Sequence, residues 1–179
     1  ALGTGDRVSA HVLRSDAADR WGPLRGRGQT LSLLKWLENT YTRGSVDLNA
    51  ALRDFALRTA RAGLVVLLSD LMAPEGVQDG LRALQSRGHE VAVIQVLAPD
   101  EVAPEISGDL KLIDVETGAP QEVTIDAAMR ALYMERFEAW QDEIAAYCVR
   151  RGIHFVAVET SMPWEQLLLS ELRRVGVVH

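Results

Sequence analysis

The feature that most constrains the fold is a pair of apolar runs without polar alternation. They are GLVVLLS at residues 63–69 and EVAVIQVL at residues 90–97. A strand of this kind is expected to be covered on both faces, which is typical of a parallel sheet. Between the runs, Val77, Leu81 and Leu84 follow one another at helical spacing. Strand, helix and strand in this order predict an α/β domain with crossover connections.

The rest of the chain continues this alternation. We expect a strand at residues 8–13, an edge strand near Trp21, a helix capped by Thr30, a helix capped by Asp47, a long helix after Asp126, a strand at residues 153–158 and a final helix after Pro163 with Leu167, Leu168 and Leu172. Together they predict a single domain over residues 1–179, with three layers and a mostly parallel, Rossmann-like sheet.

Two helices carry apolar stripes that predict buried faces. The first stripe is Leu31, Leu34, Leu37 and Tyr41, and the second is Met129, Tyr133, Phe137, Trp140, Ile144 and Cys148. Just before the long helix, two strand-like arms flank a Thr-Gly-Ala-Pro turn. They predict a β-hairpin inserted at about residues 109–125.

Composition and charge exclude several classes. A formal net charge of -6 argues against a nucleic-acid partner, which needs a clustered basic surface. The one cysteine, Cys148, excludes an internal disulfide and a cysteine-based zinc cluster. No apolar run is long enough to span a bilayer. We expect a cytoplasmic domain that this chain enters partway through, and any membrane anchor is expected to belong to a longer protein.

Asp70 follows the first apolar run and allows three interpretations: phosphate acceptor, metal ligand or turn cap. In SDLMAPEG the aspartate and Pro74 resemble the loop of a response-regulator receiver domain. A receiver also needs a lysine after its last strand, but lysine occurs only at Lys35 and Lys111. The phosphate-acceptor interpretation is therefore rejected, and a metal ligand and a turn cap remain open.

Three segments resemble von Willebrand factor A-like domains. These are GDRVSAHVL, GSVDLNAAL and GLVVLLSDL, the last of which ends in the Ser-Asp of that fold. The joint SRGHEV, the hairpin SGDLKLIDVETG and the ending RRGIHFVAVETSMPWEQLLLSEL resemble bacterial DUF family 58, a group of unknown function with such a core. The resemblance implies a partner, a MoxR-type AAA+ ATPase, and covers nearly the whole chain.

The resemblance also implies a metal-ion-dependent adhesion site. Such a site takes oxygen ligands from Asp-x-Ser-x-Ser, from a threonine and from an aspartate that Asp70 matches. Val46 stands in the threonine position and has no oxygen to offer, and Asp-x-Ser-x-Ser is absent from this chain. We therefore expect a degenerate site without a cofactor, in which Mg²⁺ is held only by a longer protein.

The other candidates point to binding rather than catalysis. The carboxyl edge of the sheet should carry Ser45, Asp47, Ser69, Asp70, Glu159 and Thr160. Ser69 lacks a nucleophile-elbow setting, the four histidines are scattered, and no glycine-rich phosphate loop is present. We therefore expect a non-enzymatic protein-interaction module. The alternative is a hydrolase or phosphotransferase that uses the edge around Asp70.

Overall fold

The computed structural model describes residues 1–14, 19–41, 45–105, 108–113, 120–163 and 165. In chain order its elements are η1 (Leu2–Thr4), β1 (Val8–Val12), β2 (Asp19–Leu24), η2 (Arg27–Gln29), α1 (Thr30–Glu38), α2 (Leu48–Arg58), β3 (Leu64–Ser69), α3 (Gln78–Ser86), β4 (Glu90–Leu97), α4 (Pro99–Val102), β5 (Gly108–Ile113), β6 (Pro120–Ile125), α5 (Ala127–Arg150) and β7 (His154–Glu159).

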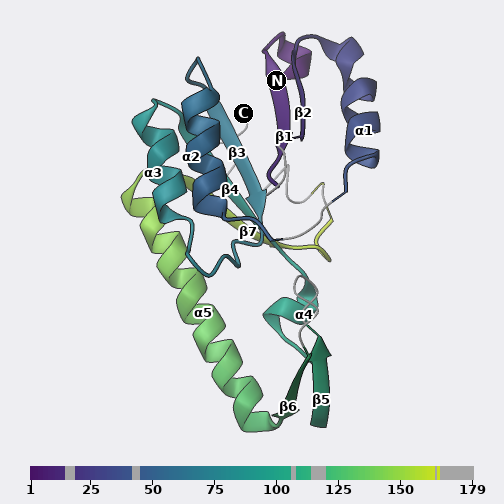
Figure 1. Ribbon diagram of the computed structural model, residues 1–179, viewed down its shortest axis with the longest axis vertical. Coiled ribbons are helices and arrows are strands. Elements are labelled where there is room, and N and C mark those ends of the chain that lie inside the picture. Colours follow the sequence, from purple (N-terminus) through teal and green to yellow (C-terminus); the bar gives the residue numbers. More distant parts are fainter. Residues whose placement is uncertain (15–18, 42–44, 106–107, 114–119, 164, 166–179) are drawn as a thin grey trace.

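A three-stranded parallel sheet of order β3-β4-β7 forms the centre of the molecule (Figure 1). The main hydrophobic core lies on one of its faces, against α2, α3 and α5. Leu81 and Leu84 of α3 and Cys148 of α5 have no exposed surface. The parallel pairing of the two apolar runs is therefore confirmed, and so is the mixed α/β class.

The opposite face of the sheet corrects one prediction. Leu64, Val66 and Leu68 of β3 remain 49%, 40% and 66% exposed, so this strand is not covered on both faces. The reason is that these three side chains alternate with Val65 and Leu67 and point away from the core that α2, α3 and α5 form, and the described residues leave this part of the outer face uncovered. The expected final helix with Leu167, Leu168 and Leu172 lies outside the described residues.

β1 and β2 form a separate antiparallel pair, which confirms an edge strand at Trp21. The Trp21 indole N–H donates to Ser32 Oγ at 3.0 Å, and this hydrogen bond connects α1 to the β1–β2 pair. The expected Thr30 cap is wrong, because η2 precedes α1 and Gln29 takes the cap position without a side-chain bond. The predicted apolar stripe is exposed rather than buried, from 48% at Leu37 to 62% at Leu31, and Tyr41 lies beyond the end of α1 with 68% exposure.

The long helix α5 begins after Asp126, whose carboxylate accepts the Met129 N–H at 2.7 Å. Its stripe is buried only in part: Phe137, Ile144 and Cys148 are buried, whereas Met129 and Tyr133 are 47% and 37% exposed. The hairpin β5–β6 confirms the predicted insertion, although residues 114–119 at its turn are outside the described residues. In Figure 1 the amino-terminal half of α5 extends past the sheet toward this hairpin.

Cys148 has the character of a core residue. Burial raises the pKa of its thiol to about 11, from an ordinary value of 9.0. The thiolate is the reactive form, so little of it is present near neutral pH. Cys148 therefore contributes packing to the contact of α5 with the sheet.

Candidate functional site

The carboxyl end of β3 is a turn held by its own side chains. Ser69 Oγ accepts the Leu71 N–H at 3.1 Å, and Asp70 Oδ1 accepts the Met72 N–H at 3.0 Å. These bonds offer the backbone a local partner where the strand ends. The turn-cap interpretation of Asp70 therefore has a direct structural counterpart, although the carboxylate as a whole is exposed.

Two buried residues, Gln95 and Leu71, also hold this turn in place. Gln95 of β4 is fully buried, and its amide donates to the Asp70 carbonyl at 3.0 Å while accepting from Gln141 of α5 at 3.2 Å. Leu71 has a φ of 63°, in the left-handed region that side-chain-bearing residues seldom occupy. Its side chain is 2% exposed, so burial holds the backbone in this conformation.

The remaining predicted edge residues belong to other elements than the Asp70 turn. Asp47 caps α2 by accepting the Ala50 N–H at 2.8 Å, as predicted. Ser45 is exposed and Val46 half-buried just before that cap. Glu159 and Thr160 end β7, with β4 between them and Asp70, which sets the outer strands about 10 Å apart.

The chemistry of this edge is limited by these bonds. Thr160 gives its N–H to the Leu97 carbonyl at 2.8 Å, and Glu159 accepts from Ser161 at 3.3 Å. In the described ranges, no three His, Cys, Asp or Glu side chains are grouped so as to hold a metal ion. The edge thus presents separate polar side chains, several of which serve turns and caps.

Asn49 is a site residue that the sequence interpretation missed. It is 7% exposed on α2, accepts the Gly80 N–H at 2.7 Å, and donates to the carbonyls of Glu75 and Gly76 at 3.1 and 2.9 Å. One amide therefore joins α2 both to the turn before α3 and to Gly80 in the first turn of α3. The available signal was a polar residue within an apolar pattern. Asn49 stands three residues before Leu52, on the same side of a helix, and Gln95 is the one polar residue in the run 91–97.

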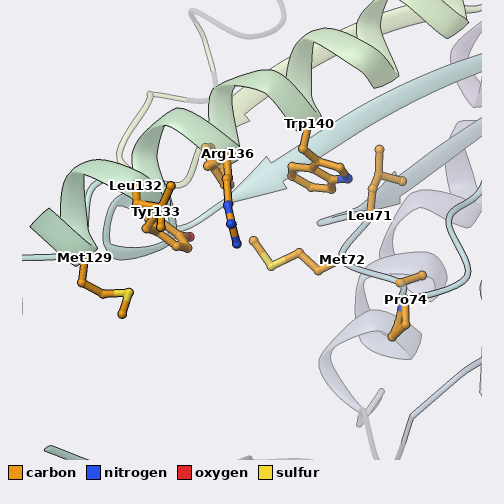
Figure 2. A pocket seen from close by; sticks show the side chains of 10 residues that line it. Leu71, Met72, Pro74, Met129, Leu132, Tyr133, Arg136 and Trp140 are labelled. Atoms are coloured by element: carbon orange, nitrogen blue, oxygen red, sulfur yellow. The ribbon is translucent and has the colours of Figure 1, made fainter. Parts of the chain in front are cut away.

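An apolar groove of about 460 Å³ begins at the Asp70 turn and runs along α5. Figure 2 shows its two walls: the turn supplies Met72 and Pro74, and the helix supplies Met129, Leu132, Tyr133, Arg136 and Trp140. The side chains of Met72 and Arg136 extend toward each other from opposite walls in this view. We call this surface the Met groove; its described lining is Leu71–Pro74 together with Met129, Leu132, Tyr133, Arg136, Phe137 and Trp140.

Polar groups in the Met groove are few. The Tyr133 hydroxyl donates to the Glu101 carbonyl, and partial burial followed by the Glu101 charge raises the pKa of this phenol. Tyr133 is therefore neutral at physiological pH. Arg136 is the one charged residue of the described lining. The groove can accordingly hold apolar side chains and one anionic group, and it lacks a nucleophile–base pair.

Helices of the described part are too short or too polar to cross a bilayer, α5 included.

The fold and the groove define a mixed α/β domain with a parallel sheet and an open apolar surface at its carboxyl edge. A family model described as "Protein of unknown function DUF58" matches residues 1–143. The chain belongs to this family. An uncharacterized protein of Mycobacterium avium, MAV169, is 32% identical over 143 residues, which cover 78% of this chain and 83% of that protein.

Two further comparisons bear on length and fold. The uncharacterized protein Mb1516 of Mycobacterium bovis is 29% identical over 167 residues, which are 90% of this chain and 52% of that protein. The chain thus spans about half the length of this relative. The conserved hypothetical protein BatB of Bacteroides thetaiotaomicron superimposes with a TM-score of 0.50 at 14% identity, over 97% of this chain and 82% of that one. That likeness concerns the fold alone.

Proposed function

We propose that this chain is a non-enzymatic protein-interaction module that contacts its partner through the Met groove. The observation that carries the proposal is the groove itself, in which Met72, Met129 and Leu132 are 44%, 47% and 41% exposed around a buried floor. Clustered exposed apolar side chains are typical of an interaction site. The turn bonds of Ser69 and Asp70 support the same conclusion, because they give these side chains a structural role.

The finer part of the proposal concerns fold family and partner. We assign the chain a von Willebrand A-like core and a MoxR-type AAA+ ATPase as its partner, because the loops quoted above resemble that group. An ATP-dependent partner implies a cytoplasmic place of action. A membrane anchor would then belong to sequence beyond the part that this chain shares with longer relatives such as Mb1516.

The test is binding to a purified MoxR-type AAA+ ATPase from the same organism. In the variant Met72→Ser/Met129→Ser we expect affinity to fall at least about tenfold, since two groove contacts are lost. Val149→Ser is the matched control: Val149 is 76% exposed on the same helix and outside the groove. It should leave binding unchanged. Failure of the wild-type chain to bind, or equal binding by both variants, would contradict the proposal.

A degenerate metal site makes a separate prediction. Because Val46 has no oxygen ligand to offer, millimolar Mg²⁺ should leave the melting temperature of this chain unchanged. Differential scanning fluorimetry with and without Mg²⁺ measures this. A rise in the wild-type chain that disappears in Asp70→Asn would show a working site. For the enzyme alternative, a phosphatase and esterase screen should detect no turnover that depends on Asp70.

A further inference from the structure

We propose that the Met groove binds one amphipathic α-helix of the partner, with aliphatic side chains between Met72 and Met129 and a carboxylate paired with Arg136. The inference rests on the proposed function and adds the chemistry of the bound segment. It is argued from the division of α5, from the opposite wall and from the charge of the groove.

The two halves of α5 differ in what covers them. The helix has 24 residues, which corresponds to about 36 Å. Ile144 and Cys148 of its second half are buried in the core, whereas Met129 and Leu132 of its first half are 47% and 41% exposed. These uncovered residues, with Tyr133 and Arg136, follow the three- and four-residue spacing of one helix face. Such a row is the surface against which a second helix packs.

The opposite wall is held in place before binding. The Leu71 side chain is buried, and the Asp70 carbonyl accepts a hydrogen bond from Gln95. Beyond the turn, the Gly80 N–H donates to Asn49. Met72 stands out from this fixed backbone with 44% of its surface exposed. A preorganised wall lowers the ordering cost of association. Its methionine adapts to apolar side chains of different shapes.

The shallowness of the groove favours a helix over a small molecule. Ligand pockets bury about 70–90% of a drug-sized ligand. In the Met groove, Met129, Leu132 and Tyr133 are 47%, 41% and 37% exposed, so the site is shallow along its length. A shallow apolar trough of this kind suits the side chains of a helix laid along it.

The positive charge of Arg136 favours an anionic group on the partner. Within the described residues, no carboxylate lies within ion-pair distance of Arg136. Its planar guanidinium binds a carboxylate through two parallel hydrogen bonds. A membrane surface is the poorer fit, because lipid recognition uses clusters of basic side chains and the described lining has one. An acidic residue on an amphipathic helix meets both the charge and the shape.

Methionine methyl NMR tests the site of binding. The chain has four methionines: Met72 and Met129 line the groove, and Met134 and Met162 lie outside its lining. The probe is an alanine/glutamine-based helical peptide of about 18 residues, or five turns, with a row of leucines and one glutamate. Adding it to ¹³C-methyl-methionine-labelled chain should shift the Met72 and Met129 signals and leave the other two in place. Uniform shifts, or none, would overturn the proposal.

A charge exchange tests the carboxylate. Replacing the glutamate of the peptide by glutamine should weaken binding to the wild-type chain about tenfold. Arg136→Glu should weaken the glutamate peptide and restore affinity for a peptide with lysine at that position. Arg136 is exposed, so this variant should fold, which circular dichroism checks. Equal affinity of all three peptides for both proteins would reject the ion pair.

The outcomes separate this inference from the proposed function. Groove-dependent binding of the ATPase together with indifference to the charge exchange would leave the function standing and remove the acidic helix. Peptide binding without ATPase binding would leave the acidic-helix site standing and remove the proposed function. Vesicles of phosphatidylcholine and phosphatidylserine form a third arm: groove-dependent binding to them, with no peptide binding, would assign the surface to a membrane instead.

Discussion

Replacing Asn49 by alanine is expected to destabilise the chain by about 3 kcal/mol, because each buried polar group left unpaired costs roughly 1–3 kcal/mol. The side chain accepts from the Gly80 N–H and donates to two carbonyls, those of Glu75 and Gly76. Alanine removes all three bonds and brings no new partner. Urea unfolding followed by circular dichroism gives the change in free energy from the shift in midpoint.

Asn39→Ala is the matched control for this prediction. Asn39 is exposed, and its amide donates to the Lys35 carbonyl of its own helix at 2.6 Å. Water can replace that bond, so its loss should cost no more than about 0.5 kcal/mol. If both variants lost the same small amount, the Asn49 bonds would not be what joins α2 to the turn before α3.

Much of the fold follows from local pattern. The apolar runs became β3 and β4, Asp47 caps a helix as predicted, the long helix begins after Asp126, and the hairpin lies where the turn between two strand-like arms placed it. Each of these depends on residues close together in sequence, where spacing decides hydrogen bonds directly. They were therefore accessible without knowledge of tertiary contacts.

Apart from the Thr30 cap, the wrong predictions concern which faces are covered. An apolar stripe shows that a surface avoids water, but the element that covers it is set by distant parts of the chain. Leu68 of β3, Leu34 of α1 and Met129 of α5 were all expected to be buried, and they are 66%, 51% and 47% exposed. For the same reason the sequence did not predict the Met groove, which combines the Asp70 turn with a helix more than fifty residues later in the chain.

In the candidate site, too, contacts between near neighbours in sequence were predicted and contacts between distant residues were not. Asp70 and Ser69 bond to N–H groups two residues away, a short-range pattern that the turn-cap interpretation captured. The bond from Gln95 to the Asp70 carbonyl spans 25 residues and needs β4 beside β3. A polar residue within a buried pattern signals such a bond, because buried amides are nearly always paired. It does not identify the partner.

A second large effect is expected from Gly80→Ala, and its sign is opposite to helix propensity. Gly80 lies inside α3, where alanine should be about 1 kcal/mol more favourable. An added Cβ would meet Leu52 Cβ at 2.7 Å and Leu52 Cδ1 at 2.8 Å, so α2 and α3 would have to separate. Overpacking of this kind costs about 1–3 kcal/mol or more. Because Leu52 Cβ belongs to the rigid part of its side chain, the cost should lie in the upper part of this range, and we expect a net loss of about 1–2 kcal/mol.

Gly63→Ala controls for the glycine substitution itself, because a Cβ there would have no neighbour within 4 Å. Its stability should stay within about 0.5 kcal/mol of wild type. Combining Gly80→Ala with Leu52→Ala removes one of the two close contacts, so the double variant should lose less than the sum of the single losses. The free energies of unfolding of all four variants, measured in urea, test whether the losses are additive. Strict additivity would mean that α2 and α3 separate without strain, and that their close approach at Gly80 is not what limits the size of this residue.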